Sequence, residues 1–475
     1  MVWLAGLLLL FIFQIATILV LEFRQPTKTV AWLLILFVLP VIGFVMYYFL
    51  AHEFTQRRRV RKRSIIPRDM RLTALRRCKL VHRPEDMHNG EFEHQERLFQ
   101  LLQNFSQSPI TGCNETMILT DGHDTFEEIL TALDRAEHHI HLEYYTIRHD
   151  EIGERFKKML IKKVREGVQV RLIYDGVGSF ELSAAYIREL EEAGVEVKCF
   201  LAPRVAFFAK RVNFRNHRKI VVVDGTTGFV GGINIGDEYL GKNKKLGYWR
   251  DTHLKLKGDS VYFLQEVFLK DWWFVTKERL DDPAYLPEHT CKRDEQVQIV
   301  SSGPNSTADT ILESVFNAIA VAKKRIWIAT PYFIPDASIL MGLRTAALSG
   351  LDVRLIIPQV SDSRLVLNAT LSYVEELLTA GVRVYRYQKG FIHAKVLLID
   401  HLMASVGTAN MDMRSFYSNF ELNALLFDRR PMERLEEDFL KDLDHSRELT
   451  LSEFSKRPWR QKGSEIVAHM LSPLL

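Results

Sequence analysis

The sequence HRKIVVVDGTTGFVGGIN at residues 217–234 has a counterpart, HAKVLLIDHLMASVGTAN, at residues 393–410. Each copy contains a histidine, a lysine two positions later, an aspartate five positions after the lysine, and a final asparagine at the same offset. One such pattern is weak, because a polar strand with a solvated lysine can produce it by chance. Two copies in register predict two imidazoles, two ammonium groups and two amides that act at a single site.

The motif supplies groups suited to phosphate chemistry. The candidate catalytic residues are His217, Lys219, Asp224, His393, Lys395 and Asp400. Alternation along a strand puts each histidine and its lysine on one face, while the aspartates end the strand, where we expect a structural role more than a substrate contact. Asn234 and Asn410 follow glycine-containing turns and can donate to phosphate oxygens. One histidine could attack phosphorus while the other handles the leaving-group proton.

The repeat extends over whole lobes. In the first half, the hydrophobic pattern predicts strands at 139–145, 168–174, 195–197 and 220–223, with helices at 125–136, 152–166 and 184–193. The second half repeats the order with strands at 325–332, 349–357, 380–384 and 396–399. A charged stretch with two prolines, residues 276–295, is the expected connection. The chain is therefore predicted to be α/β, with lobes at 106–280 and 281–475.

Bulk composition limits the function classes. The net charge is +4, and removing the six basic residues of the run 57–63 leaves −2. A general nucleic-acid binder would show a broad basic field, so we expect no nucleic-acid partner. The four cysteines are scattered without a Cys-x-x-Cys pair, which predicts neither a disulfide framework nor a zinc site, and favours reduced thiols.

The first 55 residues predict a transmembrane hairpin. Residues 2–21 and 30–50 are uncharged apolar runs of about the ~20 residues that a membrane-spanning helix needs. A signal peptide is disfavoured, because a basic first segment and a small-residue cleavage site are missing. The short loop and the basic run at 57–63 predict that both termini and both lobes are cytoplasmic. That run, in the connector 56–105, could also bind anionic membrane lipid, or its only role could be to fix the orientation of the chain in the membrane.

A longer segment before the first motif has no equal in the second lobe. It contains the apolar residues Val205, Phe207 and Phe208, flanked by the basic residues Arg204, Lys210 and Arg211. Such a segment is expected to dip into the membrane interface beside the site, or to be an ordinary core helix.

At these residues the chain resembles the phospholipase D superfamily and, within it, the bacterial cardiolipin synthases. The likeness covers nearly the whole chain. The narrower match consists of QPTKTVAW at 25–32, HLEYY at 141–145, YWRDTH at 248–253, RSF at 414–416, NFE at 419–421 and LSPLL at 471–475. Thr408 and Ala409 depart mildly from the serine that many members carry after the glycine.

The resemblance implies two lobes related by a pseudo-twofold axis, with both motifs meeting at one site. It implies the joining of two phosphatidylglycerol molecules into cardiolipin with release of glycerol, through a phosphatidyl-histidine intermediate, without metal or cofactor. It also implies that a carboxylate orients each histidine, Asp251 for His217 and Glu421 for His393. The alternatives are a hydrolase of the same superfamily and an inactive membrane scaffold. The oligomeric state is left open.

Overall fold

A 15-stranded mixed sheet runs through both lobes of the computed structural model, which describes residues 2–21, 26–50, 68–104, 108–202, 214–306 and 308–474. At its centre β1 (Thr111–Thr120) pairs antiparallel with β9 (Glu295–Ser302). Outward from β1, the first lobe adds β8 (Thr252–Gly258), β6 (Thr227–Gly231), β5 (Ile220–Val223), β2 (His139–Tyr144), β3 (Gln169–Asp175) and β4 (Glu196–Phe200).

The second lobe repeats this order from β9. Its strands are β18 (Glu421–Leu426), β16 (Met403–Gly407), β15 (Val396–Ile399), β10 (Arg325–Ala329), β12 (Asp352–Pro358) and β13 (Arg383–Tyr387), with β19 (Ser446–Leu449) added at the edge. Each motif strand, β5 or β15, thus occupies the same place in its lobe. The repeated order about an antiparallel central pair is what a pseudo-twofold relation between the lobes predicts.

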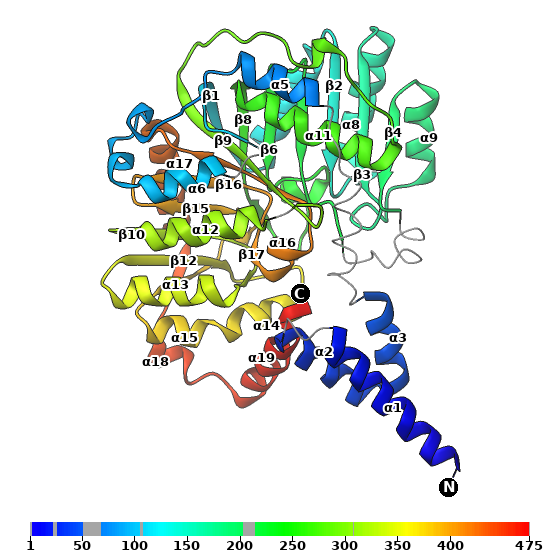
Figure 1. The fold of residues 1–475 in the computed structure, drawn as a ribbon, viewed down its shortest axis with the longest axis vertical. Helices are drawn as coiled ribbons and strands as arrows, with labels where there is room; N and C mark the ends of the chain where they lie inside the picture. The colour runs from blue at the N-terminus through cyan, green and yellow to red at the C-terminus, as the bar shows by residue number, and fades with distance from the viewer. Residues whose placement is uncertain are drawn as a thin grey trace.

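Helices cover both faces of the sheet (Figure 1). In the first lobe, α7 (Gly122–Asp134), α8 (Glu151–Arg165) and α9 (Ala184–Glu192) share one hydrophobic core with β2 and β3, while α11 (Ser260–Thr276) packs on the opposite face. In the second lobe, α12 (Thr310–Val321), α13 (Ala337–Leu348), α14 (Arg364–Ser372) and α15 (Val374–Thr379) cover one face, and α17 (Arg429–Asp444) covers the other. The predicted strands and helices are confirmed to within a few residues.

Shorter elements complete the lobes. They are β7 (Tyr248–Arg250), β14 (Gly390–Ile392), β11 (Phe333–Ile334), β17 (Met411–Asp412), α5 (Arg68–Arg77), α6 (Glu96–Asn104), α16 (Met413–Tyr417), α18 (Leu451–Phe454) and α19 (Trp459–Leu471). The pairs β7–β14 and β11–β17 are both parallel. The β7–β14 pair joins the first lobe to the second, which brings the segment before the second motif against the end of the first lobe.

The N-terminal region contains three helices, α1 (Val2–Leu21), α2 (Pro26–Val38) and α3 (Pro40–Leu50). The predicted span 30–50 is interrupted at Leu39, where Pro40 begins a new helix because it has no N–H to continue the old one. No helix in the described part of the chain is both long and apolar enough to cross a membrane, so the predicted spans are not confirmed. In Figure 1, α2 lies beside α19. The basic run 57–63 and the predicted interfacial segment, including Val205, Phe207 and Phe208, lie outside the described residues.

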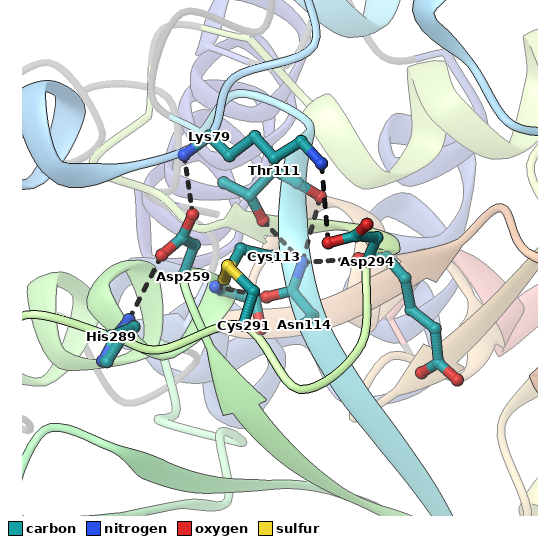
Figure 2. Close-up of a disulfide and its surroundings, with 10 residues drawn as sticks. Lys79, Thr111, Cys113, Asn114, Asp259, His289, Cys291 and Asp294 are labelled. Atoms are coloured by element: carbon teal, nitrogen blue, oxygen red, sulfur yellow. Dashed lines mark hydrogen bonds and ion pairs between the residues drawn. A yellow bond between two sulfur atoms is a disulfide. The ribbon is translucent and has the colours of Figure 1, made fainter.

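One cysteine prediction is wrong. Cys113, in β1, forms a disulfide with Cys291, in the stretch before β9, with a Cα–Cα distance of 5.2 Å (Figure 2). The pair is separated by 178 residues, so its spacing carried no signal, and only the central β1–β9 pairing brings the thiols together. Nearby, the Asp259 carboxylate accepts from the backbone N–H of Lys79 (2.7 Å) and lies 3.2 Å from His289 Nδ1 (Figure 2). Cys78 and Cys199 are free thiols.

Candidate active site

Both motif histidines line one cavity of about 1010 Å³ between the lobes. Asn234 and Asn410 line the same cavity. The histidines lie just before β5 and β15, the equivalent strands of the two lobes. The structure therefore confirms the prediction that the two copies of the motif meet at a single site.

Each histidine contacts a carboxylate from the opposite lobe. His217 Nδ1 lies 3.0 Å from both carboxylate oxygens of Glu421, and His393 Nδ1 lies 2.7 Å from Asp251 Oδ2. The sequence-based assignment of Asp251 to His217 and of Glu421 to His393 is therefore wrong. Both carboxylates were found by the resemblance, but their partners are exchanged between the lobes.

Backbone hydrogen bonds explain the exchange. His217 N–H donates to the carbonyl of Phe420 (2.9 Å), and His393 N–H donates to the carbonyl of Arg250 (2.7 Å). Each carboxylate follows one of these carbonyls directly, so the chain that holds a histidine in place also presents the carboxylate of the other lobe. Spacing within one lobe carries no information about this contact.

The carboxylates are buried and ionised. Burial raises the pKa of Asp251, but the charge of Lys395 and the hydrogen bond from His393 outweigh it and hold that pKa below its usual value. Burial likewise raises the pKa of Glu421, but His217 and Lys219 bring it below its usual value. Since an ionised carboxylate only accepts hydrogen bonds, Nδ1 of each histidine carries the proton and Nε2 is left as the nucleophilic or basic nitrogen.

The imidazoles are neutral in the free protein. Burial lowers the pKa of His393 to about 4, helped by the charge of Lys395 and opposed by Asp251. Burial also lowers the pKa of His217, with Glu421 opposing. A neutral His217 has a free electron pair on Nε2, which is what attack on phosphorus requires.

The two motif lysines are buried beside their histidines. Lys219 Nζ donates to the carbonyl of His217 (2.7 Å), and Lys395 Nζ donates to that of His393 (2.6 Å). Lys395 Nζ also lies 3.0 Å from His393 Nε2. Burial lowers the pKa of Lys219 to about 7 and that of Lys395 to about 8. Their charge is therefore easily lost unless an anion is bound between them.

The two asparagines are held differently. Asn234 accepts from the backbone N–H of Thr146 (3.1 Å) and donates to the Tyr239 hydroxyl (2.5 Å). Asn410 donates its backbone N–H to Ser415 Oγ (3.1 Å), and its side-chain oxygen has no partner among the described residues. Both amides face the cavity, where they can contact a phosphate.

The motif aspartates hold backbone, in agreement with the structural role expected from the strand pattern, and their place among the candidate catalytic residues stays a prediction. Asp224 accepts from the backbone N–H groups of residues 137–139 at 2.8 Å. Asp400 accepts from those of residues 323–325 at 2.8–2.9 Å. Each carboxylate thus anchors the start of the strand next to its motif strand, β2 or β10.

Aromatic rings flank the histidines, and sequence reasoning gave them no role. The Tyr145 ring lies 5.0 Å from that of His217, and the Trp249 ring lies 5.1 Å from that of His393. Tyr145 lies in the segment 141–145 and Trp249 in the segment 248–253, which carry the family resemblance. That resemblance was the signal from which their place at the site could have been predicted. Among the described residues, no group of three or more histidine, cysteine or acidic side chains is placed to hold a metal ion.

Comparison of the chain with known proteins identifies its family. A family model described as "Cardiolipin synthase, PLD-like domain" matches residues 129–272 and 315–443. The chain belongs to the cardiolipin synthase family of PLD-like proteins. A second model, described as "Phospholipase_D-nuclease N-terminal", matches residues 2–51.

Similar proteins of this family extend over almost the full chain. The chain is 46% identical to the cardiolipin synthase of Geobacillus kaustophilus, over 97% of this chain and 91% of that protein. It is 42% identical to the major cardiolipin synthase of Bacillus subtilis, over 96% of this chain and 95% of that protein. The fold is also similar to a phosphatidylserine synthase of Haemophilus influenzae, with a TM-score of 0.62, 14% identity, and coverage of 79% of this chain and 100% of that one.

Proposed function

We propose that the protein is a phosphatidyltransferase that moves a phosphatidyl group from one phosphatidylglycerol to another, forming cardiolipin and glycerol. The observation that carries this proposal is the pair of neutral histidines in one cavity, each held by a buried carboxylate of the opposite lobe. Transfer without net hydrolysis needs one nitrogen to hold the phosphatidyl group and a second to move a proton. The membership of the cardiolipin synthase family agrees with this assignment.

In the first step, His217 Nε2 attacks the phosphorus of the donor lipid. A P–N bond forms, the P–O bond to glycerol breaks, and the glycerol oxygen takes a proton from His393. The low pKa of His393 in the free protein makes it a strong acid once protonated. A bound phosphodiester carries a negative charge that favours this protonation, with solvent as the proton source, so that Lys395 keeps its own charge.

In the second step, a hydroxyl of the acceptor lipid replaces glycerol. His393, now neutral, takes the hydroxyl proton while the oxygen attacks phosphorus and the P–N bond breaks. His217 is restored with its electron pair, and Glu421 stabilises the positive charge that it carries in the intermediate. One residue thus acts first as an acid and then as a base.

Charge on the non-bridging oxygens is balanced by Lys219, Lys395, Asn234 and Asn410. We propose that these four groups make a metal or cofactor unnecessary, since two ammonium groups and two amides can meet the transferred phosphate. The aspartates Asp224 and Asp400 contribute through the backbone that they hold.

We propose that residues 1–55 anchor the chain in the cell membrane, with both lobes on the cytoplasmic side. The support is the apolar composition of 2–21 and 30–50, the basic run at 57–63, and the match of residues 2–51 to an N-terminal family model. Residues 56–105 then connect the anchor to the lobes at 106–280 and 281–475. Anionic lipid is concentrated at such a surface, and water is scarcer there than in solution, which favours transfer over hydrolysis.

The test uses purified full-length protein and phosphatidylglycerol vesicles. Cardiolipin and glycerol in equal amounts are the expected products. Phosphatidic acid without cardiolipin would instead indicate a hydrolase, and absence of any product would indicate a scaffold. The His217→Ala/His393→Ala protein is the control for contaminating activity.

A further inference from the structure

The proposed transfer requires two phosphate groups in the cavity at once, the phosphatidyl group on His217 and the phosphodiester of the acceptor lipid, and the motif residues serve only the first. The acceptor lipid brings its own phosphate, three carbons away from the hydroxyl that reacts. An uncompensated phosphate in a partly buried cavity is unfavourable, so a further cation is needed. This inference rests on the proposed function and adds the acceptor site to it.

Three arginines line the cavity, and two of them already have carboxylate partners. Arg148 pairs with Glu181 and, at 3.1 Å, with Glu238. Arg215 pairs with Asp175 at 3.4 Å, and both side chains are at least 99% buried. These charges are largely neutralised within the protein, so they offer little to a ligand.

Arg414 differs from them. It lies on α16 of the second lobe, is half-buried and lines the cavity. Its one side-chain hydrogen bond within the described residues is a long one, 3.4 Å from Nε to the amide oxygen of Asn419, and no carboxylate of these residues forms an ion pair with it. Its terminal guanidinium nitrogens therefore remain available for an anion.

The position of Arg414 relates it to the reaction centre. Asn419, which accepts from Arg414, donates in turn to Glu421 Oε1 (3.1 Å), and Glu421 holds His217. Arg414 also lies near Tyr145: burial raises the pKa of this tyrosine, and the charge of Arg414 partly opposes that rise. The Tyr145 ring contacts that of His217, so Arg414 faces the side of the cavity where His217 lies.

We propose that Arg414 binds the phosphodiester of the acceptor phosphatidylglycerol, and that it thereby selects a phosphate-bearing alcohol over a simple one. A guanidinium presents parallel N–H donors that match two phosphate oxygens, which suits this role better than an ammonium group. The first half of the reaction, and its reversal by glycerol, needs no second phosphate and therefore depends much less on Arg414.

Two assays on the same full-length protein in phosphatidylglycerol vesicles test this. Cardiolipin synthesis requires the second phosphate, whereas exchange of radiolabelled glycerol into phosphatidylglycerol does not. Arg414→Gln should reduce cardiolipin synthesis on the order of 10–100-fold, the effect of losing a charged hydrogen-bonding pair, and should reduce glycerol exchange far less. Arg414→Lys should restore part of the synthesis. Arg344→Gln, which removes a surface arginine paired with Glu376, is the control and should affect neither assay.

Each other outcome overturns the proposal. Equal loss of both activities in Arg414→Gln would mean that Arg414 serves the transferred phosphate or the fold. Loss of neither would mean that the acceptor is bound elsewhere. If inorganic phosphate inhibits the wild type, and Arg414→Gln escapes inhibition while making cardiolipin normally, the arginine binds free phosphate instead. A wild-type protein inactive in both assays would reject the proposed function itself.

Discussion

Nδ1 of His393, in the second lobe, lies 2.7 Å from Asp251 Oδ2 at the end of the first lobe, and both groups are buried. The same relation holds in reverse between His217 and Glu421. Neither lobe alone therefore contains a complete histidine–carboxylate pair. The two histidine–carboxylate pairs exist only when the lobes are joined, and the sheet is continuous across them.

The crossed pairs predict which variants accumulate the covalent intermediate. If His217 is the nucleophile and His393 the proton carrier, His393→Ala should trap labelled lipid on the protein, and His217→Ala should not. Asp251→Asn should also trap labelled lipid, but less of it than His393→Ala, because it removes the carboxylate that orients His393 and leaves the imidazole in place. We expect turnover to fall on the order of 10²–10⁴-fold, as when a buried orienting carboxylate is replaced. Acid-quenched protein on a denaturing gel measures the trapped label.

Glu421→Gln is the matched comparison for that experiment. It should lose turnover without accumulating label, since Glu421 orients the nucleophile. Label on Glu421→Gln, with none on Asp251→Asn, is the pattern that pairing within one lobe would produce. Label on His217→Ala but not on His393→Ala would reverse the assignment of the nucleophile.

The lysine pKa values predict an alkaline decline in kcat/KM. The pKa of Lys219 is lowered to about 7 and that of Lys395 to about 8, so both ammonium charges disappear as pH rises through this range. The pKa of His217 lies below its usual 6.5, so the nucleophile is already neutral on the acidic side of the decline. We expect kcat/KM for phosphatidylglycerol to fall between pH 7 and 9, measured in vesicles diluted with a zwitterionic lipid to limit surface charge.

Lys219→Arg tests whether loss of the lysine charge causes the alkaline decline in kcat/KM. An arginine keeps its charge throughout the range, so the lower part of the decline should disappear even if the variant is slower. A profile that still rises at pH 9 in the wild type would contradict the role of the ammonium groups.

The motif aspartates should affect stability more than chemistry. Asp400 accepts three backbone N–H groups at the start of β10, and Asp400→Ala removes all three bonds. We expect the free energy of unfolding to fall by about 2–4 kcal/mol, with activity per folded molecule largely kept. Thermal unfolding in detergent and titration of active sites measure the two quantities. Asp281→Ala, at an exposed position, should change neither, and a folded but inactive Asp400→Ala protein would contradict this role.

The disulfide predicts a specific pattern of thiol labelling. Denatured protein should label at Cys78 and Cys199 alone before reduction, and at all four cysteines after it. The double variant Cys113→Ser/Cys291→Ser should lose about 2–4 kcal/mol of unfolding free energy, because the bond closes a long loop of the unfolded chain. Cys199→Ser is the control, and four labelled thiols without reduction would show that the bond does not form in solution.

The sequence by itself determined the doubled motif, the α/β class and the order of elements. These depend on local periodicity: helix 152–166 was predicted and α8 covers Glu151–Arg165, and the predicted strand 220–223 is β5. The choice of the motif histidines, lysines and asparagines as candidate site residues also followed from residue type and spacing. Each of these inferences uses neighbours along the chain, where hydrophobic spacing decides the structure.

Only the tertiary structure decided which side chains meet. Antiparallel pairing of β1 with β9 brings Cys113 to Cys291, and backbone bonds from His217 to Phe420 and from His393 to Arg250 exchange the carboxylates between lobes. Such contacts join residues more than 100 positions apart. The physical reason is that each lobe buries its sheet edge against the other, and the contacts that follow depend on this docking and not on any local pattern.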